Sequence, residues 1–110
     1  MARGAAHQAV QALEKLPESS PVPTEGYSAI NRIIIDYLEQ RLEQSFRGLT
    51  QEKIADDLMA RGIESQTISA LRNELDAADF ARFARVADVG DLRLAVERAQ
   101  GLISQIEEAL

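Results

Sequence analysis

The feature that most constrains the fold is an apolar stripe near the C-terminus that repeats every three or four residues. It begins after Asp91, a residue well suited to cap a helix N-terminus. This spacing places apolar side chains on one face of an α-helix. The sequence therefore predicts an amphipathic helix over residues 91–109, whose apolar face needs other helices to pack against. The stripe consists of Leu92, Ala95, Val96, Ala99, Leu102, Ile103, Ile106 and Leu110.

Two further helices are predicted in the first half of the chain. One covers residues 4–16 and is expected to stop at Pro17, and the other covers residues 25–46 with Thr24 as its N-cap. The proline-rich stretch 17–23 between them is expected to be an extended connector. The second helix is apolar on more than one side, which is typical of a helix at the centre of a bundle. Its apolar residues are Tyr27, Ile30, Ile33, Ile34, Ile35, Tyr37, Leu38 and Leu42.

The middle of the chain predicts a third and a fourth helix. Gly48 is expected to close the second helix, and Thr50 is expected to be the N-cap of the third. The third helix is expected to end at Gly62, which would have a positive φ, and Ile63 would make the hydrophobic contact that often follows such a glycine. Ser65 is expected to cap the fourth. Its continuation over residues 76–84 is left open between helix and a short turn. The predicted inner faces are Ile54, Leu58 and Met59 for the third helix, and Ile68, Leu71 and Leu75 for the fourth.

These patterns together favour an all-α fold. No segment shows the alternation that is typical of strands, and 110 residues suit one domain. With few aromatic residues, the core must consist mainly of Leu, Ile, Val and Ala, which suits helix packing. We therefore expect residues 1–110 to form a single compact bundle of about five helices, with the third and fourth in a helix-turn-helix-like arrangement.

Composition argues against several classes of partner. The chain has 12 basic and 18 acidic residues, a net charge of −6, and an acidic surface repels phosphate backbones and anionic lipid headgroups. No apolar run approaches the ~20 residues that a membrane-spanning helix needs. The lack of Cys excludes disulfides and thiolate metal ligands. Nucleic acid binding and membrane insertion by this chain are therefore not expected.

Residues that could carry catalysis are sparse and scattered. The only histidine, His7, lies near the N-terminus without a carboxylate pair beside it, so a solvated side chain is expected. The acidic pairs Asp56–Asp57 and Glu107–Glu108 are adjacent in sequence, and adjacent helical residues point about 100° apart, so solvated faces are expected. The glycines are isolated, which excludes a phosphate-binding loop. The sequence predicts no catalytic, cofactor or metal site, and no enzyme.

One segment resembles a DNA-reading motif. Residues 49–76 contain Thr50-Gln-Glu-x-Ile-Ala and a later Thr-Ile-Ser, as in helix-turn-helix proteins. Its glycine, Gly62, follows Ala55 by seven residues instead of the usual four. The segment contains three basic and six acidic residues, whereas a recognition helix needs Arg or Lys to bind phosphates. DNA binding through this segment is kept as an alternative, and homo-oligomerisation through the last helix is another.

The most distinctive segment is Asp79-Phe-Ala-Arg-Phe-Ala-Arg85. Phe80 and Phe83 are three residues apart and can share one helical face that fills the core. Alternatively, they form a docking surface with Arg82 and Arg85, because aromatic and Arg side chains often dominate the binding energy of interfaces. Phe80, Arg82, Phe83 and Arg85 are therefore the candidate partner-docking residues.

A family resemblance rests on this segment and on the order of motifs around it. The order runs from Asp36-Tyr-Leu38 and Gly48-Leu-Thr-Gln-Glu52 through Leu58-x-x-x-Gly62-Ile63 to Ala78-Asp-Phe-Ala-Arg-Phe-Ala84 and a long amphipathic helix. It resembles the C-terminal cytoplasmic region of BatD-type proteins, the bacterial oxygen tolerance or aerotolerance family, over about residues 5–110. The family usually places Pro where this chain has Arg85.

The resemblance implies that the chain is excised from a larger membrane-anchored protein. Such proteins carry an export signal, periplasmic β-sandwich modules and one transmembrane helix before this tail, and are encoded beside MoxR-type ATPases and von Willebrand factor A-domain proteins. The tail would then lie on the cytoplasmic side of the inner membrane and dock those partners without catalysis. The resemblance implies no catalytic residue or cofactor.

Overall fold

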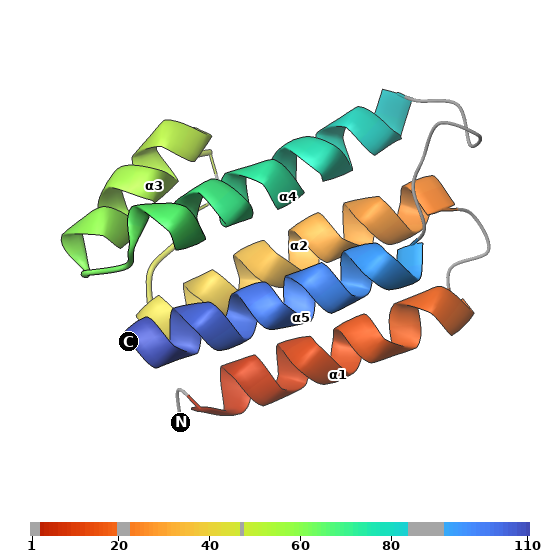
Figure 1. Ribbon diagram of the computed structural model, residues 1–110, viewed down its shortest axis with the longest axis horizontal. Coiled ribbons are helices and arrows are strands. Elements are labelled where there is room, and N and C mark those ends of the chain that lie inside the picture. The colour runs from red at the N-terminus through yellow and green to blue at the C-terminus, as the bar shows by residue number, and fades with distance from the viewer. Residues whose placement is uncertain (1–2, 20–22, 47, 84–91) are drawn as a thin grey trace.

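The structure is a computed structural model that describes residues 3–19, 23–46, 48–83 and 92–110, without the side chains of 3, 17–19, 23–25 and 78–83. Within these ranges the chain forms five α-helices and no strand, so the predicted all-α bundle of about five helices is confirmed (Figure 1). The helices are α1 (Arg3–Ser19), α2 (Pro23–Leu42), α3 (Gln51–Ala60), α4 (Ser65–Phe83) and α5 (Leu92–Ala109).

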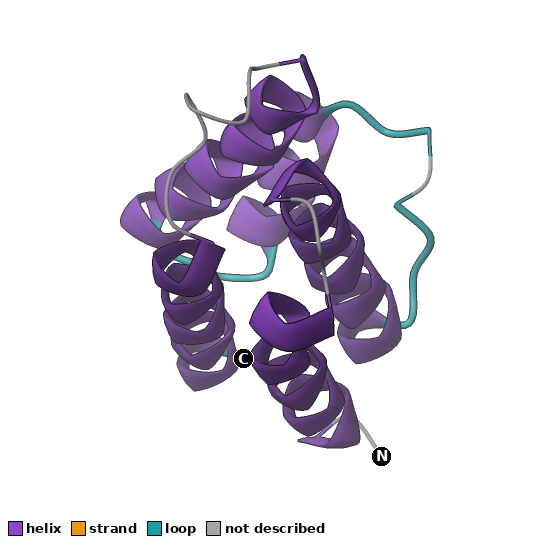
Figure 2. Cartoon of the chain, turned by 90° about the vertical axis from the view of Figure 1, so that its right-hand side faces the viewer, coloured by secondary structure: helices purple, strands orange, loops and turns teal. Residues whose placement is uncertain are grey.

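The four long helices alternate in direction along the bundle. α2 contacts α1, α4 and α5, and α5 also contacts α1 and α4, so the α2–α5 pair separates α1 from α4 (Figure 1). The short helix α3 lies outside this arrangement and packs against α4. Seen along the bundle, the long helices surround a common centre (Figure 2). This is the up-down-up-down order of a four-helix bundle, with α3 inserted between its second and third helices.

The core lies where α2 faces its three neighbours. Leu13 of α1, Leu71 of α4 and Ile106 of α5 are almost fully buried together with Ile34 and Leu38 of α2. Burying each such side chain stabilises the fold by about 1.5–3 kcal/mol relative to exposure. The prediction that α2 is the central helix is therefore confirmed. Among the described helices, none is long and apolar enough to cross a bilayer.

The first connection is shorter than the sequence predicted. α1 continues through Pro17 to Ser19, and α2 already begins at Pro23, so the expected connector over residues 17–23 is wrong for most of its length. Pro17 has no N–H to donate to the Leu13 carbonyl, so the last turn of α1 lacks that backbone hydrogen bond. Proline is favoured in the first turn of a helix, where its missing N–H has no partner to lose. Thr24 consequently lies inside α2 and is not its N-cap.

The C-terminus of α2 is also different from the prediction. The helix ends at Leu42, four residues before the predicted end, because Glu43 adopts a left-handed conformation with φ of 53°. The Gln44 N–H then donates to the Glu39 carbonyl at 3.1 Å, as in a Schellman closure. The Glu39 carboxylate accepts a hydrogen bond from the Phe46 N–H at 2.8 Å, next to the buried Phe46 ring. A left-handed residue other than Gly or Asn gives little signal in a sequence.

The predicted boundaries of α3 are confirmed at both ends. The Thr50 hydroxyl accepts a hydrogen bond from the Lys53 N–H at 3.2 Å, which is the N-cap geometry. Gly62 has a φ of 92°, and the Ile63 N–H donates to the Leu58 carbonyl at 3.2 Å. Ile63 is buried against this turn, as expected for the hydrophobic contact of a Schellman motif.

Three details of α3 and α4 correct or complete the predictions. Met59 was expected on the inner face of α3, but it is 57% exposed, because Ile54, Ala55 and Leu58 already form the face that meets α4. Ser65 is the first helical residue and not the cap, since the Ile68 N–H donates to the carbonyl of Glu64. Residues 76–83 continue α4 as helix, which resolves the alternative left open there.

The predicted helix over 91–109 is confirmed as α5. Its apolar stripe is buried from Ala95 to Ile106 against α1, α2 and α4, while Leu110 at its end is 39% exposed. The stripe is therefore covered within one chain, so a seam between chains along it has no support. Asp91, the predicted N-cap, lies outside the described residues.

Candidate functional site

The candidate docking residues lie at the far end of α4. Phe80, Arg82 and Phe83 belong to its last turn, but their side chains are outside the described part of the structure, and Arg85 lies outside it altogether. Whether the two phenylalanines fill the core or dock a partner therefore stays a prediction.

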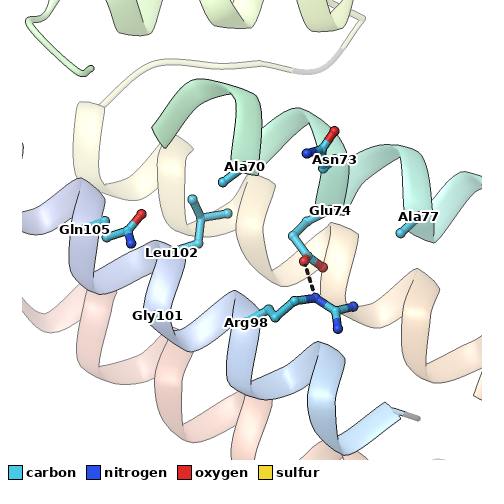
Figure 3. A pocket seen from close by; sticks show the side chains of 8 residues that line it. All are labelled: Ala70, Asn73, Glu74, Ala77, Arg98, Gly101, Leu102 and Gln105. Carbon is cyan, nitrogen blue, oxygen red and sulfur yellow. Dashed lines mark hydrogen bonds and ion pairs between the residues drawn. The ribbon is translucent and has the colours of Figure 1, made fainter. Parts of the chain in front are cut away.

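A groove between α4 and α5 holds an ion pair between the two helices (Figure 3). It has a volume of about 610 Å³ and is open to solvent. We call it the α4/α5 groove. Its residues are small or polar except for one leucine: Ala70, Asn73, Glu74 and Ala77 of α4, and Arg98, Gly101, Leu102 and Gln105 of α5.

Glu74 is the unusual residue of this groove. It lies on α4 beside Leu71 and Leu75, on the side that packs into the bundle, and only 8% of the residue is exposed. Its Oε1 accepts a hydrogen bond from Arg98 Nε at 2.7 Å (Figure 3). Its Oε2 is buried and has no hydrogen-bond partner among the described residues. Leaving a buried acceptor unpaired costs about 1–3 kcal/mol.

Arg98 is far more exposed than its partner. Its side chain is 53% exposed against 10% for Glu74. The hydrogen bond to Glu74 raises the pKa of Arg98 above its ordinary value, and burial has a smaller, opposite effect. Tyr27 makes a minor contribution that also raises this pKa. A half-exposed ion pair adds little stability, because water already solvates the guanidinium. The pair alone therefore does not compensate for placing the Glu74 carboxylate inside the bundle.

Gly101 gives the groove its depth. It lies in the middle of α5, where glycine is about 1 kcal/mol less favourable than alanine. A Cβ at Gly101 would have no heavy atom within 4 Å, so packing within the chain does not require glycine there. Gly26 of α2 is different, because a Cβ there would lie 2.6 Å from Cδ2 of Leu92. The absence of a side chain at Gly101 leaves open space beside α5 on the groove wall.

The groove continues into a second hollow toward the C-terminal end of α5. Ala70 and Gln105 line both, and the second hollow has a volume of about 760 Å³. Glu64, which directly precedes α4, and Glu108 of α5 are both exposed and lie at its far end. Ala77 is thirteen residues beyond Glu64, which corresponds to about 20 Å along the helix axis. We call the two hollows together the extended groove.

The α3–α4 pair forms another hollow on a different face. Glu52, Asp56, Met59 and Arg72 are among its lining residues. This surface includes part of the predicted helix-turn-helix segment, and its two carboxylates outnumber its one guanidinium. Phosphate groups would meet more repulsion than attraction here.

Glu107 has a structural role that the sequence did not predict. It was expected on a solvated face, but its Oε1 accepts hydrogen bonds from Tyr37 Oη at 2.5 Å and from Arg41 Nε at 2.9 Å. Burial and the hydrogen bond to Glu107 raise the pKa of Tyr37 well above its ordinary value. This trio ties α2 to α5. Glu108, its neighbour, is exposed as expected.

The other residues considered for catalysis remain apart. His7 is exposed on α1, and Asp57 pairs with Arg61 at 3.0 Å while Asp56 is exposed. In the part of the chain that the structure describes, no three His, Cys, Asp or Glu side chains are grouped so that they could hold a metal ion.

Sequence reasoning missed the groove, although two signals were present. Glu74 is a charged residue between the buried Leu71 and Leu75, and Gly101 interrupts a helix that is otherwise rich in good helix formers. Both departures from a regular pattern are typical of sites shaped by something other than stability. Neither residue shows from sequence alone that Arg98 would meet Glu74, since that contact depends on how α4 and α5 pack.

Comparisons with protein-family models, with curated proteins and with solved structures found no match to this chain. The resemblance to the BatD-type tail therefore stays a prediction.

Proposed function

We propose that this chain is a non-catalytic protein-binding domain and that the α4/α5 groove is its main contact surface. The observation that carries the proposal is the Glu74 carboxylate, which lines the groove and has one oxygen without a hydrogen-bond partner among the described residues. Gly101 supports it independently, because it leaves room that the chain itself does not use.

The shape of the groove favours a protein segment over a small molecule. Small-molecule sites are usually concave pockets that enclose most of the ligand and are mainly apolar. The extended groove is instead open, about 20 Å long by the helical rise, and lined by small residues between polar ones. An elongated partner segment fits these features better than a compact ligand does.

The family resemblance indicates which partners to test first. If this domain is the cytoplasmic tail of a membrane-anchored aerotolerance-type protein, MoxR-type ATPases and von Willebrand factor A-domain proteins are the candidates. The segment with Phe80, Arg82, Phe83 and Arg85 begins directly beyond Ala77, which lines the groove. We propose that Phe80, Arg82 and Phe83 extend the contact surface along α4, with Arg85 following in the sequence.

The decisive experiment blocks the groove without disturbing the core. Gly101→Leu places a side chain in open space on the groove wall, and Gly4→Leu is the matched control, since Gly4 is also an exposed helical glycine with nothing within 4 Å of an added Cβ. Binding of the purified domain to the candidate ATPase and A-domain proteins is measured by isothermal titration calorimetry. We expect Gly101→Leu to abolish binding and Gly4→Leu to leave it unchanged. Equal binding by both variants would remove the groove from consideration.

DNA binding through residues 49–76 is a second candidate. Its support is that Gln66, Arg72 and Asn73, the side chains suited to read bases, are exposed on α4. A mobility-shift assay at low salt tests it, because a DNA-binding domain gives at least non-specific shifts under those conditions. With the acidic surface of α3 beside these residues, we expect no shift at micromolar protein.

A further inference from the structure

We propose that the extended groove binds an amphipathic helix of a partner protein, and that this helix carries two basic residues three turns apart. The inference rests on the proposed function and specifies the chemistry of the segment that occupies the groove.

Charge indicates a basic occupant. Three carboxylates, those of Glu74, Glu64 and Glu108, line the extended groove against one guanidinium, that of Arg98. The whole chain carries a net charge of −6, which steers cationic partners toward it. Oε2 of Glu74 already lies beside a guanidinium and lacks a donor of its own. A Lys or Arg side chain of the occupant balances the excess negative charge of the groove.

The walls of the groove indicate a helix. Ala70 and Ala77 on α4 and Gly101 on α5 allow close approach of another backbone. The gap between two antiparallel helices of a bundle accommodates a further helix, which presents residues at i, i+4 and i+7 to it. A helix of about 13 residues spans the ~20 Å between Ala77 and Glu64.

The separation of the carboxylates sets the spacing of the basic residues. Glu74 is ten residues beyond Glu64, the residue that precedes α4, or about 15 Å along the helix axis. On the partner helix, positions i and i+11 lie on one face and are about 16 Å apart. One basic residue thus reaches Glu74 while the other reaches Glu64 and Glu108 at the opposite end. A small residue at i+4 then lies over Ala70 and Gly101, which are each about one helical turn from the Glu74–Arg98 pair.

A display library of 18-residue helical peptides tests this inference. The peptides have a fixed Ala-rich scaffold and randomised positions on one face, and they are selected for binding to the full domain. We expect selected peptides to carry Lys or Arg at two positions eleven residues apart. The inference would be overturned if the selected peptides lack this pair. It would also be overturned if every selected peptide still binds the Gly101→Leu variant.

Protein variants then connect the pair to Glu74. Glu74→Gln keeps the shape and removes the charge, and Glu97→Gln is the matched control on an exposed carboxylate of α5 that lines neither hollow. We expect Glu74→Gln to weaken the selected peptide at least tenfold and Glu97→Gln to change its affinity less than twofold. Circular dichroism verifies that both variants fold. Replacing the two basic residues of the peptide by Gln is expected to give a larger loss with unmodified protein, because the contacts to both ends of the groove are then removed.

The two proposals fail in different ways. If Gly101→Leu blocks the partner proteins but Glu74→Gln and the Gln peptide bind normally, the groove is a docking site and the basic occupant is wrong. If Gly101→Leu leaves the binding of partner proteins intact, the proposed function of the groove is wrong, whatever the peptides do.

Discussion

Glu74 is a buried carboxylate with one oxygen that has no hydrogen-bond partner among the described residues, so we expect it to lower the stability of the fold. Buried ion pairs are often no better for stability than apolar residues of similar volume. Here one oxygen of the buried carboxylate is also unpaired, and Arg98 is exposed enough to be solvated by water alone. We expect Glu74→Met to raise the free energy of unfolding by about 1 kcal/mol, measured by urea denaturation. A loss of more than ~1 kcal/mol would mean that the pair with Arg98 stabilises the fold.

The two helical glycines Gly101 and Gly26 should respond in opposite directions to alanine. Gly101→Ala adds a methyl group in open space, so only the gain in helix propensity remains, about 0.5–1 kcal/mol of added stability. Gly26→Ala brings a Cβ to 2.6 Å from Leu92, and the resulting overpacking costs more than the propensity returns, about 1 kcal/mol net. Thermal or urea unfolding of both variants measures the difference. In a Leu92→Ala background the penalty at Gly26 should vanish, and its persistence would mean that another contact causes it.

Residues in regular patterns were predictable, and residues that break patterns were not. The buried stripe of α5 and the glycine turn at Gly62 followed directly from spacing and from conformational preference. The end of α2 was not predictable, because Glu43 adopts a left-handed conformation that the sequence disfavours. The exposure of Met59 depends on which face of α3 meets α4, and that is decided by packing between helices.

α3 is the least supported element of the fold. It has ten residues, makes its main helix contact with α4, and buries only Ile54, Ala55 and Leu58. An element with so few buried contacts is expected to open locally before the rest of the domain unfolds. Hydrogen exchange should therefore be faster in α3 than in the central part of α2, which is buried by three neighbours.

The N-cap of α3 gives this expectation a direct test. Thr50→Ala removes the hydroxyl that accepts from the Lys53 N–H, which costs about 1 kcal/mol. If α3 opens on its own, its amides should exchange about five times faster in the variant, while the slowest amides of α2 keep their rates. Mass spectrometry of deuterium uptake distinguishes the two helices. An equal change in α2 would indicate that α3 unfolds only together with the whole domain.

At the scale of the whole molecule, the class of fold was predictable and the site was not. Periodicity and capping indicate how many helices form and which face of each is buried. They do not indicate that the α2–α5 pair separates α1 from α4, nor that α4 and α5 lie close enough to form a groove. Loop lengths and the matching of side-chain shapes decide those neighbours. The same limit explains why Glu107 was expected in water, although it meets Tyr37 across the bundle.

The Tyr37–Glu107 contact should make the stability of the whole domain depend on alkaline pH. Tyr37 is buried, and its pKa is raised above the ordinary value of about 10, first by burial and then by the hydrogen bond to Glu107. Above pH 10 the tyrosine ionises in the unfolded chain but stays neutral in the folded one. The unfolded state then binds fewer protons, so stability falls by up to about 1.4 kcal/mol per pH unit through this residue.

Tyr37→Phe isolates this contribution. At pH 8 the variant should lose about 2 kcal/mol, because a hydrogen bond to a charged acceptor is removed. Between pH 10 and pH 11 the unmodified domain should lose more stability than the variant, because Phe has no proton to release. Urea denaturation at pH 8, 10 and 11 measures both effects, and absorbance at 295 nm shows whether Tyr37 ionises only on unfolding. Lysines and other groups titrate in the same range, but they do so in both proteins and cancel in the comparison. Parallel pH profiles for the two proteins would mean that the phenol of Tyr37 ionises in the folded bundle, and that the contact between α2 and α5 does not hold it neutral.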